Sequence, residues 1–315
     1  MRLNLSLLAL ATALGLASLL WAPTTLFALP ADVARTILIE LRLPRALLGL
    51  AVGASLGLTG AALQGLLRNP LASPDVLGTS TGAALGAVVA SYYIGVGGTF
   101  GLALGGMSGA LLALALLLLL AGRGATTATL VLAGVAVSAL AAALTNLALS
   151  LAPSPFALYD VLYWLLGSLA DRSLDHVAFA LPPMIFGCWL AWRGRRGLDA
   201  LALDEDVAAT LGVDIARLRR DIVIGTGLAV GAGVAVAGAI GFIGLVVPHL
   251  VRPFMRHRPG ATLLPSALGG AALLTAADLI VRLPFSGGEL KLGVVTAMIG
   301  APFFLWLILK GKAAS

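Results

Sequence analysis

Charged residues are scarce in this 315-residue chain. Only 11% of its residues are Asp, Glu, Lys or Arg, whereas 60% are hydrophobic, and the mean hydropathy is +1.04. A soluble globule of this length needs more polar surface than that to cover its core. The composition therefore excludes a soluble protein and indicates an integral membrane protein.

Cysteine and enzyme motifs are also missing or nearly so. The single cysteine, Cys188, lies inside an apolar run, which excludes an intrachain disulfide and a cysteine-based metal site and favours a small core residue. The chain has no GxxxxGK[ST] phosphate loop, no HExxH motif and no triad signature. We therefore expect no catalytic residues, no metal site and no nucleotide site, so energy for any transport must come from elsewhere.

Long apolar runs dominate what is present. They lack the polar and apolar alternation of barrel strands and have about the 20 residues that a spanning helix needs. We therefore predict an all-α, polytopic membrane protein with one transmembrane domain over residues 1–315. Its ten predicted crossings cover residues 3–21, 46–66, 79–97, 100–121, 127–150, 176–192, 222–240, 241–254, 261–281 and 290–309. Residues 158–169 are too few to span and predict an interfacial or re-entrant helix, and residues 31–45 are expected outside the bilayer.

The basic residues set the orientation. Ten crossings with the N-terminus inside place 14 of the 20 Lys and Arg residues on one side, which is therefore the cytoplasmic side. Both termini are then cytoplasmic. Because the basic residues lie at helix ends, the net charge of +6 reflects topology and gives no reason to expect a nucleic-acid partner.

The densest cluster of charge, residues 198–221, is predicted to be cytoplasmic, and we call it the handle. Three acids at 204–206 open a short helical pattern, where they suit the positive end of the helix dipole. Leu203, Val207 and Leu211 follow at four-residue spacing, and Gly212 ends the pattern. A second short helix is expected from Ile215 to Arg220. Such a pair of helices could be gripped by another protein, although an ordinary solvated loop is the alternative.

An internal repeat links the two halves of the chain. Residues 49–54 and 227–232 both read GLAVGA, at an offset of 178, and Pro70 falls on Pro248 at the same offset. The two copies are the second and seventh predicted helices, which run in opposite directions. This arrangement predicts an inverted repeat of helices 2–5 and 7–10, as in many transporters, with chance similarity between Gly/Ala-rich helices as the alternative. Small residues at every fourth position from Gly49 to Gly65 also predict close helix packing.

Few polar residues fall inside the predicted helices. Asp278 is the best candidate for an ion-coupling acid, but it lies near the outer end of its helix beside Arg282, which favours a local ion pair or cap. His249 is expected to be a structural hydrogen-bonding residue. His176 and His257 are expected at solvated loop edges.

Several motifs, in order along the chain, resemble the FecCD family of permeases, which are the membrane subunits of type II ABC importers for ferric siderophores, haem and cobalamin. The motifs are RLPR at 42–45, NPLASPDVLG at 69–78, LAGV at 132–135, GFIGLVVPHLVR at 241–252 and GVVTAMIGAPFF at 293–304. Together they extend the resemblance over about residues 33–310.

The resemblance implies a bacterial inner-membrane homodimer of ten-helix subunits around a central pathway. Its implied partners are a second copy of the chain, two cytoplasmic ATPase subunits and a periplasmic substrate-binding protein. The chain itself would bind no cofactor, because ATP and Mg²⁺ belong to the ATPase. The form of the 69–75 loop favours a ferric siderophore as the metal-chelate substrate, or haem, and leaves cobalamin and oxyanions open.

Particular residues take roles from the same resemblance. Coupling to the ATPase is implied for Asp204, Glu205, Asp206, Ala209, Leu211, Gly212, Val213 and Arg217. Docking of the binding protein is implied for the outward-facing residues Arg42, Arg45 and Arg282, and cytoplasmic gates for Asn69, Leu71 and Thr127. The segment 158–169 resembles the helix that gates the periplasmic end.

Other classes of function make different demands on the sequence. A secondary transporter driven by an ion gradient needs a buried titrating acid, so Asp278 would have to face the pathway. A membrane-embedded enzyme needs converging polar groups within the bilayer, and the sequence offers none. A channel without partners would leave the handle without a purpose.

Overall fold

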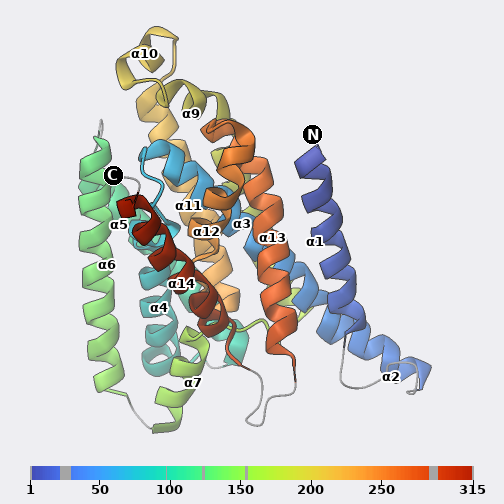
Figure 1. The fold of residues 1–315 in the computed structure, drawn as a ribbon. Coiled ribbons are helices and arrows are strands. Elements are labelled where there is room, and N and C mark those ends of the chain that lie inside the picture. Colours follow the sequence, from blue (N-terminus) through green and yellow to red (C-terminus); the bar gives the residue numbers. More distant parts are fainter. Residues whose placement is uncertain are drawn as a thin grey trace.

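The long helices of the chain run side by side in one bundle (Figure 1). The computed structural model describes residues 2–21, 30–96, 98–122, 125–152, 155–283 and 290–313, and all regular elements in this part of the chain are helices. The predicted all-α, polytopic membrane fold is confirmed.

The elements follow the apolar runs closely. The first half contains α1 (Arg2–Leu20), α2 (Ala31–Thr36), η2 (Ile37–Arg42), α3 (Leu43–Leu66), η3 (Pro74–Leu77), α4 (Thr79–Val89), η4 (Ala90–Ile94), α5 (Gly98–Ala121), α6 (Thr127–Ser150) and α7 (Pro155–Leu165). The second half contains α8 (Leu174–Arg193), α9 (Arg195–Leu201), α10 (Glu205–Thr210), α11 (Ile215–Ala237), α12 (Ile243–Val251), η5 (Arg252–Met255), α13 (Pro259–Val281) and α14 (Leu292–Ala313).

Seven helices in the described residues are long and apolar enough to cross a membrane. They are Arg2–Leu20, Ala31–Leu66, Gly98–Ala121, Thr127–Ser150, Leu174–Arg193, Ile215–Ala237 and Pro259–Val281. The other three predicted crossings coincide with α4 and η4, with α12 and η5, and with the apolar part of α14. The short α7 lies where the interfacial or re-entrant helix was expected.

Residues 31–45 form a helix that continues into α3, with Arg42 buried, and their place outside the bilayer stays a prediction. One predicted boundary was wrong. The second handle helix, expected to end at Arg220, is instead the start of the long α11. An i,i+4 contact between Arg217 and Asp221, with 3.8 Å between the guanidinium Nε and the carboxylate, supports the helix across that point.

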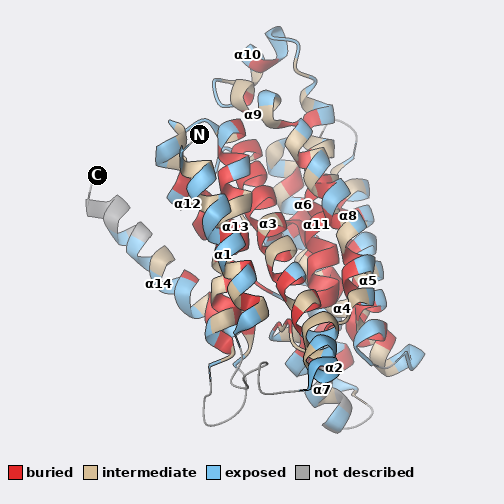
Figure 2. Cartoon of the chain, turned by 90° about the vertical axis from the view of Figure 1, so that its right-hand side faces the viewer, coloured by how far each residue is buried: buried red, intermediate tan, exposed pale blue. Residues whose placement is uncertain are grey.

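Glycines set the closest helix contacts. A Cβ atom added to Gly57 of α3 would lie 2.0 Å from the carbonyl oxygen of Ser266 in α13, and one added to Gly60 would lie 2.0 Å from that of Gly244 in α12. The predicted small-residue stripe of α3 therefore allows backbone-to-backbone packing. As a result α3 and α11 form the buried centre of the bundle, whereas α1 and α14 are more exposed (Figure 2).

Helix pairings agree with the predicted repeat. As the second helix, α3 packs on α13 and α12, the ninth and eighth. As the seventh helix, α11 packs on α5 and α4, the fourth and third. If helices 2, 3 and 4 are exchanged with their repeat partners 7, 8 and 9, the contacts of α3 become the contacts of α11. Gly231 of α11 is equivalent to Gly53 of α3 and likewise makes a close contact, with Ala110 of α5.

The two ends of the bundle differ. α9 and α10 project beyond one end, the handle end, toward which the N-terminal start of α1 also points (Figure 1). α2 and α7 lie at the opposite end, which we call the outer end. Large apolar side chains such as Leu112 and Leu132 are exposed along the sides of the bundle, where a bilayer would surround them.

Candidate functional sites

The handle is fixed to the bundle at its beginning. Leu198 and Leu201 of α9 are buried in the core beneath it. The Asp199 carboxylate accepts a hydrogen bond of 2.8 Å from the backbone N–H of Gly260, in the first turn of α13, and pairs with Arg258 at 2.7 Å. Because first-turn N–H groups have no partner within their own helix, Asp199 ties α9 to the end of α13.

α10 is held between its own cap and α11. The Asp204 carboxylate caps α10 by accepting a 2.9 Å bond from the backbone N–H of Asp206. Glu205 accepts two bonds, of 2.7 and 2.8 Å, from the guanidinium of Arg219 in α11. Arg219 also donates to the backbone carbonyl of Ala125 at 3.2 Å, so one side chain links α10, α11 and the turn before α6.

An apolar stripe remains uncovered on the projecting face of the handle. Leu203, Val207 and Leu211 expose 70%, 42% and 64% of their surfaces. The predicted coupling residues Asp206, Ala209 and Gly212 are exposed beside them. In contrast Ala208, on the opposite face of α10, is fully buried. Val207 lies in α10 and the two leucines lie in the turns that flank it, and such a group of exposed apolar side chains on a protruding segment is typical of a protein interface.

The handle turns back toward the membrane at Gly212. This glycine has a φ of +81°, a left-handed conformation that glycine adopts without strain. The N–H of Val213 then bonds to the carbonyl of Ala208 at 3.1 Å, and the Asp214 carboxylate caps α11 through the N–H of Arg217 at 2.9 Å. The eight predicted coupling residues thus lie on one compact projection, with Val213 half-buried at its base.

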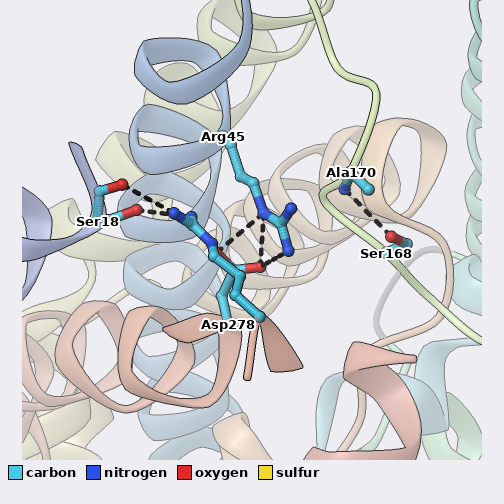
Figure 3. Close-up of polar contacts among 6 residues, drawn as sticks. Ser18, Arg45, Ser168, Ala170 and Asp278 are labelled. Atoms are coloured by element: carbon cyan, nitrogen blue, oxygen red, sulfur yellow. Dashed lines mark hydrogen bonds and ion pairs between the residues drawn. The ribbon is translucent and has the colours of Figure 1, made fainter. Parts of the chain in front are cut away.

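Arg45, one of the three predicted docking arginines, meets Asp278 at the outer end (Figure 3). Arg45 of α3 and Arg282, just after α13, both pair with Asp278 of α13. The side chains of Arg45, Arg282 and Asp278 expose only 12%, 8% and 2% of their surfaces. The ion pair expected for Asp278 is therefore present, and it involves a second arginine on another helix.

Two of the three predicted docking arginines, Arg282 and Arg42, hold the C-terminal end of α1. Arg282 donates to the backbone carbonyl and to the hydroxyl of Ser18, each at 2.7 Å. Arg42 donates to the carbonyls of Leu19 and Leu20 at 2.9 and 3.3 Å. Cations suit the unpaired carbonyls at a helix C-terminus. All three arginines lie at the outer end, as the topology predicts, but turn inward, and their role in docking stays a prediction.

Two of the three predicted gate residues follow the end of α3, and the third begins α6. Asn69 follows α3 and forms a turn in which its side-chain oxygen accepts a 2.9 Å bond from the N–H of Leu71. Both residues are exposed. Thr127 is half-buried at the first position of α6. At the outer end the turn after α7 bonds to α14 through the N–H of Leu292 and the carbonyl of Gly167, at 2.9 Å.

The described residues contain no group of three or more His, Cys, Asp or Glu that could hold a metal ion. His176, expected at a solvated loop edge, is instead buried in the first turn of α8, where it forms a capping box with Ser173. The spacing of these two residues matches a capping box, but histidine in place of Glu or Gln conceals the pattern. Cys188 is half-buried, with its sulfur 3.6 Å from the hydroxyl of Ser55.

A family model, sequence relatives and a solved structure all resemble this chain. A model of the FecCD transport family matches residues 5–310. The vitamin B12 import system permease protein BtuC of Salmonella typhi is 42% identical over 278 residues, covering 86% of this chain and 83% of that protein. Its counterpart in Klebsiella pneumoniae subsp. pneumoniae is 43% identical over 280 residues, covering 87% and 82%.

A solved structure agrees over nearly the full length. It is an inward-facing structure of an ABC transporter described as of metal-chelate type, with a TM-score of 0.88, 31% identity, and coverage of 98% of this chain and 99% of that one. The chain therefore belongs to the FecCD transport family and is the multi-pass permease subunit of a bacterial inner-membrane ABC importer, without enzymatic activity of its own.

Proposed function

We propose that the chain moves a cobalamin-type metal chelate into the cell. The observation that carries this proposal is the identity of 42% to vitamin B12 permeases over 86% of the chain. It draws on many more positions than the 69–75 loop, whose form favours a ferric siderophore. Cobalamin, expected as an alternative from the sequence, thus becomes the first choice, with ferric siderophores and haem as the competing cargoes.

Partner subunits supply energy and selectivity in this proposal. Two copies of the chain enclose the pathway, two ATPases bind the handles, and a periplasmic protein delivers the chelate at the outer end. The exposed stripe of Leu203, Val207 and Leu211 supports the ATPase contact. At the outer end, Arg45 and Arg282 pair with Asp278, and Arg42 binds backbone carbonyls of α1, so the proposed docking of the binding protein there rests on the family resemblance of these three positions.

The connections of the handle indicate how a push from the ATPase would travel. Asp199 joins α9 to the start of α13, and Glu205 joins α10 to Arg219 of α11. α13 in turn packs on α3, and α11 on α5, through close small-residue contacts. Because closely packed helices move as units, displacement of the handle shifts both halves of the repeat together.

We expect Leu211→Asp to abolish ATPase binding while leaving the permease folded. The side chain is 64% exposed, so the free permease loses little on substitution, whereas a charge in the middle of an apolar interface costs several kcal/mol of binding free energy, roughly a hundredfold or more in affinity. Co-purification with the ATPase measures the effect, and the unfolding temperature of the permease is the control. Full ATPase binding by the variant would show that the handle is an ordinary loop.

Cargo identity is tested by competition in the assembled importer. Proteoliposomes with the permease and its ATPase receive the cognate binding protein and labelled cyanocobalamin, followed by excess unlabelled cyanocobalamin, ferric hydroxamate siderophore or haem. We expect only unlabelled cyanocobalamin to suppress uptake of the label. ATP-dependent uptake of the siderophore or haem without uptake of cyanocobalamin would reject cobalamin and retain the importer.

A further inference from the structure

We propose that a cavity at the handle end of the bundle binds an anionic phospholipid of the inner leaflet. The cavity has a volume of about 590 Å³ and lies between the last turns of α5, the first turn of α6 and the first two turns of α11. Its wall includes the apolar residues Leu119, Leu130 and Val223. Its rim includes the basic residues Arg217, Arg219 and Arg220. None of the three residues of the exposed stripe lines this cavity, whereas Arg217 at its rim is also one of the predicted coupling residues.

The cavity lies at the ends of the spanning helices, where the head groups of a surrounding bilayer would be. α5 ends at Ala121 and α6 begins at Thr127, so the apolar part of both helices stops beside the cavity. α9 and α10 project further, beyond these helix ends (Figure 1). A cavity at this level is bordered by acyl chains on one side and by head groups on the other.

Three guanidiniums lie at the rim, with the carboxylates of Asp214, Asp221 and Glu205 beside them, and two of the three arginines are exposed. Arg217 and Arg220 expose 58% and 59% of their side chains. Both approach the same carboxylate, that of Asp221, at 3.8 and 3.5 Å, so one acid serves two guanidiniums. Asp214, also at the rim, uses its carboxylate to cap the N–H of Arg217. A phosphodiester can accept several hydrogen bonds from paired guanidiniums, which makes it a suitable ligand for this rim.

The apolar wall favours a lipid over the partner ATPase. Below the arginines the wall consists of Leu119, Leu130 and Val223, from three different spanning helices. Leu119 is among the most exposed leucines of the described residues. A phospholipid offers a phosphate for the arginines and an acyl chain for the apolar wall, whereas the proposed function places the ATPase on the projecting stripe. Basic pockets between membrane helices on the cytoplasmic side are typical anionic-lipid sites.

Arg219 connects this cavity to the handle. Its guanidinium lies at the rim and is bound by Glu205 of α10. A lipid seated beside Arg219 therefore packs against the residue that holds α10 on α11. Occupancy of the cavity would limit movement of α10 relative to the membrane.

Native mass spectrometry of the purified permease–ATPase complex tests the proposal. The probes are dioleoyl phosphatidylglycerol and dioleoyl phosphatidylcholine in equal amounts. We expect the wild type to retain phosphatidylglycerol preferentially, and Arg217→Gln with Arg220→Gln to lower that retention by on the order of tenfold, since each basic residue near a membrane contributes a severalfold preference. Leu119→Trp should lower retention with every charge intact. Arg196→Gln, at an exposed arginine of α9 outside the cavity, is the matched control and should change nothing.

Three results would overturn the proposal. Equal retention by the wild type and the double variant would remove the arginines from the site. Displacement of the lipid by millimolar inorganic phosphate, together with unchanged retention in Leu119→Trp, would indicate a simple anion site without an acyl chain. Crosslinking of the ATPase to residue 220 in a lipid-free complex would assign the cavity to the partner.

Discussion

Replacing Asp278 by asparagine is expected to destabilise the permease by about 3–5 kcal/mol, the largest loss that we predict for one side chain. The substitution keeps the shape of the residue but leaves the guanidiniums of Arg45 and Arg282 without their carboxylate, at positions that are 12% and 8% exposed. Arg282 also holds Ser18, so the end of α1 should loosen as well. The midpoint of thermal unfolding in a single detergent measures the loss.

A double variant and a control separate this effect from a general loss of charge. Adding Arg45→Gln to Asp278→Asn removes one of the uncompensated cations and should recover about 1–2 kcal/mol, because the two residues are in direct contact. Glu40→Gln, at an exposed acid of the neighbouring η2, should change stability by less than about 0.5 kcal/mol. Wild-type stability in Asp278→Asn would contradict the ion cluster.

The same variant bears on the ion-driven alternative. A coupling acid must bind and release its ion during transport, whereas Asp278 is enclosed by two permanently charged arginines. An Asp278→Asn protein that folds like the wild type but no longer transports would favour a secondary transporter, and a protein that unfolds would favour a structural acid.

Replacing Gly57 by alanine is expected to cost about 3 kcal/mol or to prevent assembly of α3 with α13. The new Cβ would lie 2.0 Å from the carbonyl oxygen of Ser266 and 2.8 Å from its carbonyl carbon. These are backbone atoms that cannot rotate away, so the two helices would have to separate. Thermal unfolding and the yield of monodisperse protein measure the loss.

Gly49 of the same helix provides a matched control. A Cβ atom there would meet only Leu169 and Thr275, both at 3.5 Å, which is ordinary van der Waals contact. Gly49→Ala should therefore be neutral or stabilise α3 by up to about 1 kcal/mol through the higher helix propensity of alanine. Equal effects of the two substitutions would mean that the close approach of α3 and α13 does not limit stability.

Features with a regular period along the chain were predictable. The glycines of α3 recur at every fourth position, and the predicted close packing is confirmed, with α13 as the partner helix. Leu203, Val207 and Leu211 have the same spacing and form the exposed stripe. In both cases the four-residue spacing carries the information, so the sequence alone reveals it, although Leu203 and Leu211 lie in the turns that flank α10.

Features that depend on distant partners were not predictable. Arg42 turns inward because it finds the carbonyls of Leu19 and Leu20, and backbone acceptors have no signature in the sequence. The helix end expected after Arg220 is absent, because the charged residues at the start of α11 have partners within α11 and on α10. Arg219 pairs with Glu205 of another helix, and Arg217 lies one turn from Asp221. Charge at a membrane boundary was therefore a poor guide to where a helix ends.

The most direct test of the central claim is the energy source of transport in proteoliposomes. The permease and its ATPase are reconstituted with the handle facing the lumen, ATP is enclosed or omitted, and the cargo is supplied outside on its binding protein. We predict uptake only with ATP, unaffected by a protonophore and lost in Leu211→Asp. Uptake that needs no ATPase and collapses with the protonophore would contradict an importer driven through the handle.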